Sequence, residues 1–169
     1  MILEFIEVLD EFQNVVYRDE NITNILHTEG EQYILELLFN GTTPPDYYYF
    51  GLDNRSNLTQ NDTMASIVGE PLANQQTGYG RAPVTSGGGQ QGFTVPVNYQ
   101  GNMRSQSPLL VYTCNTVPWG PVQNIFMTTK GDNVYGGALL ISSAKLSLPL
   151  SMTPSQTVRM RFSMQLANC

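Results

Sequence analysis

The sequence is poor in charge, and in positive charge above all. Only 13% of its 169 residues are Asp, Glu, Lys or Arg, whereas about a quarter is usual in globular proteins. Eight basic residues stand against fourteen acidic ones, giving a formal net charge of −6. The basic residues are scattered, with Arg159 and Arg161 as the only close pair. Because phosphate binding needs clustered positive charge, this composition argues against a nucleic-acid-binding protein.

Long apolar runs and an export signal are lacking too. No apolar stretch approaches the length that spans a bilayer. The first residues, MILEFIEVLDEF, are interrupted by Glu4, Glu7 and Asp10. They have neither a basic start nor a small-residue cleavage site, so they do not fit a signal peptide. We therefore expect synthesis in a cytosol without export, and no membrane partner.

Histidine and cysteine are nearly absent, which restricts the chemistry open to the chain. His27 is the only histidine and has no motif around it, so we expect a solvent-exposed or helix-capping residue. Cys114 and Cys169 have no neighbouring histidine, and without an export signal free thiols are favoured over a disulfide. The glycine-rich run 87–92 lacks the Lys-Ser/Thr pair of a phosphate-binding loop. No G-x-S-x-G nucleophile motif occurs.

Four carboxylates, Asp53, Asp62, Glu70 and Asp132, fall near the ends of predicted strands. A glycosidase would need two acids facing each other across a cleft, and the spacing does not indicate this. Solvated loop acids are the favoured interpretation. Asp53, Asn54 and Asp62 could offer oxygen ligands to calcium, but not with the spacing of an EF-hand. We predict no catalytic, cofactor-binding or metal-binding residues.

Aromatic residues concentrate at Tyr47 to Tyr49, and Trp119 lies between a proline and a glycine. If exposed, such rings could form a platform on which a sugar stacks. In a strand, however, Tyr47 and Tyr49 share one face while Tyr48 takes the other, so at least one set faces the core. A tryptophan buried at a proline corner is the favoured interpretation of Trp119.

A short helix is predicted from Gly30 to Asn40. Its apolar positions recur at spacings of three and four residues and are Tyr33, Ile34, Leu37 and Leu38. Thr28 and Glu31 have the spacing of a capping box, which predicts Thr28 as the N-cap. Gly41 suits the left-handed residue that ends many helices, and two prolines follow it.

The first 28 residues are predicted to form a separate N-terminal arm. Residues 2–9 fit either a helix, through Ile2, Phe5, Ile6 and Leu9, or a strand, through Leu3 and Phe5. Residues 14–27 mix β-branched and polar side chains, which favours an extended segment. Arms of this kind often complete their fold on a neighbouring subunit.

The remainder, residues 29–169, is predicted to be one β-sandwich domain that begins with the helix. The predicted strands are 47–52, 81–85, 93–99, 109–114, 122–128, 137–143, 146–150 and 158–166, with a short helical turn near residues 63–66. The last strand alternates strictly. Its predicted core residues are Val158, Met160, Phe162, Met164 and Leu166, and its predicted solvent-facing residues are Arg159, Arg161, Ser163 and Gln165. The fold class is therefore mainly β, an antiparallel, jelly-roll-like β-sandwich.

The order of motifs over residues 30–166 resembles a known family. A helix leads into YYYFGL, and a Gly-Glu-Pro precedes GYGRAPV. Later, WGPVQNIFM leads to GGALLIS. This order resembles the small virion structural proteins of tailed bacteriophages, which occur as capsid decoration (cement) proteins or as tail and fibre components.

The resemblance implies a sandwich that forms a homo-oligomer, often a trimer, and binds the major capsid protein or another virion protein. The positions that match recurring ones are Glu70, Tyr79, Gly80, Arg81, Trp119 and Gly120. It implies that they determine the fold, with Glu70 and Arg81 as an ion pair. Our hypothesis is a non-enzymatic decoration protein located in the virion. The alternatives are a tail, neck or fibre component for host attachment and, more remotely, a carbohydrate-active enzyme.

Overall fold

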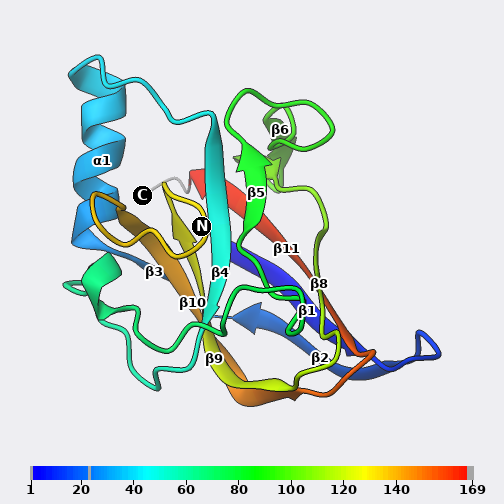
Figure 1. Ribbon diagram of the computed structural model, residues 1–169. Helices are drawn as coiled ribbons and strands as arrows, with labels where there is room; N and C mark the ends of the chain where they lie inside the picture. Colours follow the sequence, from blue (N-terminus) through cyan, green and yellow to red (C-terminus); the bar gives the residue numbers. More distant parts are fainter. Residues whose placement is uncertain (1, 23, 167–169) are drawn as a thin grey trace.

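The computed structural model describes residues 2–22 and 24–166, and Figure 1 shows two β-sheets with one α-helix beside them. In chain order the elements are β1 (Ile2–Leu9), β2 (Val15–Ile22), β3 (Asn24–Leu26), α1 (Thr28–Phe39), β4 (Tyr47–Asp53), the 3-10 turn η1 (Met64–Ser66), β5 (Ala82–Thr85), β6 (Val97–Tyr99), β7 (Asn102–Gln106), β8 (Leu110–Thr113), β9 (Trp119–Thr128), β10 (Leu140–Met152) and β11 (Thr157–Leu166). No helix in the described ranges is long and apolar enough to cross a membrane.

The strands form two antiparallel sheets, which confirms the predicted mainly β sandwich. One sheet has the order β2-β1-β11-β7-β6, with β8 also paired to β11. The other has the order β3-β10-β9-β4-β5. The pairs β1–β11, β3–β10 and β4–β9 are nested along the chain, as in a jelly-roll-like fold. Residues far apart in sequence therefore lie side by side.

The predicted N-terminal arm is not confirmed, because residues 2–22 and 24–26 contribute three strands to the two sheets. β1 lies between β2 and β11, so residues 2–9 form a strand and the helical alternative is wrong. Leu3, Ile6 and Val8 are buried. A register shift between Leu3 and Phe5 lets Leu3 and Ile6 both face the core, although they are three residues apart.

The alternation predicted for the last strand is confirmed at its centre. Val158, Met160 and Phe162 are buried, and Met164 is half-buried. The side chain of Leu166 lies outside what the structure describes. Ser163 was expected to face solvent but is buried, because β11 is an inner strand on which Ile2 and Gln106 flank this position. Arg159, Arg161 and Gln165 are half-buried on that face.

Two other strand predictions differ from the structure. The predicted strands 137–143 and 146–150 are one continuous strand, β10, which is bent by register shifts against β9. The predicted strand 93–99 is reduced to β6, which forms a hairpin with the unpredicted strand β7. Pro96 cannot donate to a ladder, and β7 is too polar to show an alternating pattern.

The sheet containing β9 is buried on both faces. Toward the other sheet, Phe50 stacks on Phe162 with ring centroids 4.6 Å apart. On the far side, a second apolar cluster comprises Leu58, Met64, Ile67, Phe126, Ala138 and Leu140. This second layer, under the loops around η1 and after β9, is where the polar site described below is built.

Helix α1 packs against β10 but begins differently from the prediction. Its N-cap is His27, not Thr28, and no side-chain capping bond forms. Gly30 permits the close packing, since a Cβ there would lie 2.1 Å from the carbonyl oxygen of Ile141. Gly41 adopts the expected left-handed conformation after the helix, with φ of 69°. Leu38 was expected in the core but is exposed.

Candidate functional site

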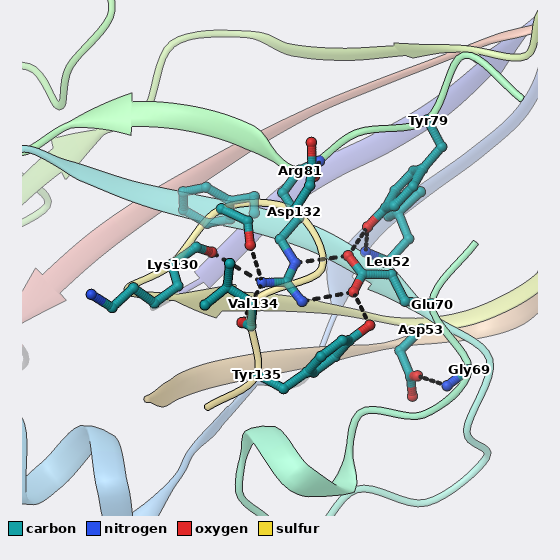
Figure 2. Close-up of polar contacts among 12 residues, drawn as sticks. Leu52, Asp53, Gly69, Glu70, Tyr79, Arg81, Lys130, Asp132, Val134 and Tyr135 are labelled. Atoms are coloured by element: carbon teal, nitrogen blue, oxygen red, sulfur yellow. Dashed lines mark hydrogen bonds and ion pairs between the residues drawn. The ribbon is translucent and has the colours of Figure 1, made fainter. Parts of the chain in front are cut away.

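A buried ion pair between Glu70 and Arg81 is the centre of the most elaborate polar cluster in the structure (Figure 2). Arg81 Nε lies 2.8 Å from Glu70 Oε1, and Nη2 lies 2.7 Å from Oε2. The Arg81 and Glu70 side chains are 0% and 6% exposed. Two-point contact of this kind fixes both groups in orientation as well as in charge. The ion pair that the motif resemblance implied is thus confirmed.

The remaining Arg81 donors hold the loop that follows β9. Nη1 donates to the carbonyl oxygens of Lys130, Gly131 and Val134 at 3.0, 2.6 and 3.3 Å. The Arg81 backbone N–H donates to Asp132 Oδ1 at 2.5 Å. A guanidinium can serve several acceptors at once because it carries five N–H donors. Arg81 therefore joins residues 130–134 to the chain just before β5.

Two aromatic rings enclose the Arg81 guanidinium. Its central carbon lies 5.3 Å from the Phe126 ring centroid and 5.1 Å from that of Tyr135, which is cation–π range. Burial disfavours the charge on Arg81, but the hydrogen bonds and charge of Glu70 outweigh this and raise its pKa. Arg81 is thus held in its charged form inside the protein.

The Glu70 carboxylate also accepts from two tyrosines. The hydroxyl of Tyr79 donates to Oε1 at 2.6 Å, and that of Tyr135 donates to Oε2 at 2.9 Å. The Tyr79 hydroxyl in turn accepts the Leu52 N–H at 2.9 Å. Burial, with the nearby Glu70 charge, raises the pKa of Tyr79 well above its usual value. With four donors on its two oxygens, Glu70 is committed to holding the structure together and is poorly placed to act as a catalytic base.

The other three carboxylates also accept hydrogen bonds, and that of Asp132 accepts from the Arg81 N–H as described above. Asp53 is buried and accepts the N–H groups of Arg55 and Gly69, each at 3.0 Å, and burial raises its pKa. Asp62 accepts the Thr59 N–H at 2.6 Å and Arg55 Nη1 at 3.0 Å. These hydrogen bonds lower the pKa of Asp62, and the bond from the Thr59 N–H has the largest effect.

The prediction of solvated loop acids is therefore wrong for Asp53 and Glu70, which are buried, and for Asp62, whose side chain is only 14% exposed. Asp132 is exposed as expected. The calcium alternative gains no support, since the Asp62 carboxylate is paired with Arg55. Within residues 2–22 and 24–166, no group of three or more His, Cys, Asp or Glu side chains is arranged to hold a metal ion.

Trp119 is buried, as the favoured interpretation predicted. It is 7% exposed, its Nε1 donates to the Thr77 carbonyl oxygen at 3.0 Å, and its ring meets Tyr79 edge-on at 6.0 Å. The sugar platform with the tyrosine run does not form. Trp119 begins β9, whereas Tyr49 pairs with Thr128 at the other end of that strand. Tyr47 and Tyr49 share a face, as alternation predicted.

Gly80 and Gly120, the glycines among the recurring positions, both lie where a side chain would crowd a neighbour. A Cβ on Gly80 would lie 3.2 Å from Asp132 Oδ2. Gly120 has φ of 122°, and a Cβ there would lie 2.6 Å from the carbonyl oxygen of Leu150. The six recurring positions therefore all serve packing or the Arg81 cluster.

A cleft of about 320 Å³ opens beside Trp119, between residues 68–71 and 119–122. Glu70 and Trp119 line it, but their polar atoms are bonded to interior partners. Asn54 also lines the cleft. The remaining lining residues are Val, Gly and Pro, which carry no ionisable side chain and are a weak basis for chemistry.

His27 is buried, so the expectation of a solvent-exposed residue is wrong. It does occupy the N-cap position of α1, but its side chain makes no capping hydrogen bond. Its Nε2 lies 2.9 Å from Ser143 Oγ, and Nδ1 has no hydrogen-bond partner among the described residues. Burial lowers the pKa of His27. Cys114 is a buried free thiol, and Cys169 lies outside the described residues.

The sequence did not point to Tyr135, Phe126 or the carbonyl groups of residues 130–134 as partners of Arg81. No local pattern marks them, because they lie 45 or more positions away in the chain. Comparison of the chain with protein-family models, curated proteins and solved structures found no match. Function is therefore inferred from the residues and motifs of this chain.

Proposed function

We propose that this chain is a non-enzymatic virion protein of a tailed bacteriophage that decorates the capsid and stabilises its shell. The observation that carries the proposal is the amount of apolar surface left exposed on a charge-poor protein. Large apolar side chains are exposed on α1, in the turn after β1 and along residues 95–99. Apolar surface concentrated in patches indicates sites of protein association.

The use of the acidic residues supports a structural role. Glu70, Asp53 and Asp62 each accept hydrogen bonds that hold loops in place. A carbohydrate-active enzyme with paired acids would need one carboxylate free to exchange a proton and another facing it. Assembly, which needs only a rigid surface, fits this arrangement better.

The phage assignment is supported by the motif order that includes Glu70, Arg81 and Trp119. In the structure these residues connect loops that lie far apart in the chain, which suits a protein that must keep its shape in a particle. Binding only to the mature shell would stabilise that shell by mass action. The expected partner is the major capsid protein, and a homo-oligomer, with a trimer favoured, remains the prediction for the chain itself.

The test is the copy number of the protein in purified virions of the encoding phage, measured by quantitative mass spectrometry against the major capsid protein. A ratio of the same order as that of the capsid protein is expected. A ratio far below it would replace decoration by a tail, neck or fibre role. Absence from washed particles would overturn the virion assignment.

A further inference from the structure

The exposed face of α1 is divided along its length into an acidic end and an apolar end. At 3.6 residues per turn, Glu31, Leu35, Leu38 and Phe39 fall on one stripe. The opposite side, with Gly30 and Tyr33, is buried against the body of the protein. Figure 1 shows α1 at the edge of the molecule, beside the sheet and not between the two sheets.

The apolar side chains at the C-terminal end of this stripe are largely exposed to solvent. Leu35, Leu38 and Phe39 are 56%, 67% and 76% exposed. Toward the N-terminus the same stripe carries Glu31, and α1 contains no basic residue. A solvent-facing helix normally carries polar residues at such positions. Three neighbouring large apolar side chains with an acid one turn away have the composition of a binding surface.

We propose that the stripe formed by Glu31, Leu35, Leu38 and Phe39 docks on a different protein, through an apolar surface flanked by lysine or arginine. This inference rests on the proposed function, for which it supplies the contact surface, and in that setting the partner is a capsid subunit. The apolar side chains supply the buried contact, and the basic residues of the partner lie over Glu31 and fix the orientation.

The charge of Glu31 argues against a second copy of this chain as the protein that binds the α1 stripe. Two α1 helices packed antiparallel would put Glu31 of each against the apolar end of the other. Packed parallel, the two Glu31 carboxylates would face each other, and like charges oppose association. The same features favour a partner with positive charge beside an apolar surface.

The test measures binding of the purified chain to empty shells of the major capsid protein of the encoding phage, brought to their mature form. The main variant carries Leu38→Ser and Phe39→Ser together. Its matched control carries Leu72→Ser and Leu148→Ser, at positions 66% and 61% exposed and outside the apolar surfaces named above. Because all four side chains are largely exposed, both variants should keep the thermal midpoint of the wild type, which is checked first.

A second pair of variants tests the charge. Glu31→Lys is compared with Glu20→Lys, which makes the same change at an exposed position on β2. We expect binding at least about 30-fold weaker for the Leu38/Phe39 variant and about 10-fold weaker for Glu31→Lys. Each control should stay within about 2-fold of the wild type.

The outcomes separate the two proposals. If the wild type binds shells and the α1 variants bind equally well, the docking surface is wrong while the decoration role stands. If the wild type fails to bind shells, the decoration role and this inference both fall. If sedimentation shows an oligomer that the Leu38/Phe39 variant dissociates, the stripe joins copies of the chain, and a different partner is excluded.

Discussion

Replacing Glu70 with glutamine removes the negative charge beside Arg81 while almost preserving the shape of the side chain. Each Glu70 oxygen accepts from one Arg81 nitrogen and one tyrosine hydroxyl. In either orientation of the glutamine amide, its NH2 group replaces an oxygen that accepts from Arg81, so two hydrogen-bond donors face each other. Arg81, with a fully buried side chain, then keeps its charge with no counter-charge on Glu70.

The expected cost follows from the burial of the pair. Breaking a buried ion pair by removing one partner costs about 3–5 kcal/mol, a large share of the about 5–15 kcal/mol by which domains are stable. We therefore expect Glu70→Gln to lower the free energy of unfolding by about 3–5 kcal/mol. For a chain of this length the thermal midpoint should fall by roughly 6–20 °C.

The assay is urea unfolding at pH 7, followed by the fluorescence of Trp119, the only tryptophan. Trp119 contacts Tyr79, which binds Glu70, so the signal reports on this region. Glu20→Gln is the matched control, because Glu20 pairs with Arg18 on the surface, with both side chains 51% exposed. Exposed pairs contribute little. Equal losses in the two variants would refute the stabilising role of the buried pair.

Two further predictions concern helix α1. Because burial lowers the pKa of His27 below its usual 6.5, the unfolded chain takes up the proton more readily, and stability is lost as pH falls below about 6.5. Urea unfolding between pH 7 and 5 should show this loss in the wild type and a smaller one in His27→Gln; parallel profiles would disprove the assignment. Gly30→Ala should destabilise the fold by at least about 2 kcal/mol, since the added Cβ meets the Ile141 carbonyl oxygen. Gly136→Ala, where no atom lies within 4 Å, serves as its control, and thermal unfolding that leaves Gly30→Ala unchanged would show that the helix can shift.

Several strands could be predicted because their signal is local. Val158, Met160 and Phe162 alternate in a strand and face the core, and Gly41 ends the helix in the expected conformation. In β1 the same kind of pattern was ambiguous. Ile2, Phe5, Ile6 and Leu9 fit a helix, whereas Leu3 and Phe5 fit a strand. Pairing with β11, about 150 residues away, makes the segment a strand.

The candidate site was less predictable than the strands. In the sequence, Asp53 and Glu70 cannot be distinguished from other acidic residues in polar loops. Their burial depends on which segments fold over them. Arg81 gains its role from Glu70, Phe126, Tyr135 and the carbonyl groups of residues 130–134, which converge from separate segments. Only the motif resemblance pointed to the pairing of Glu70 with Arg81.

The amino-acid sequence by itself determined the mainly β class, the short helix and the alternation of the last strand, because side-chain periodicity and turn residues act over a few neighbouring positions. Only the tertiary structure decided that residues 2–9, 15–22 and 24–26 are strands of the sheets, that Glu70 and Arg81 form a buried pair, and that Leu35, Leu38 and Phe39 stay exposed. Burial depends on which distant segments cover a side chain, and that is fixed by the packing of the whole chain.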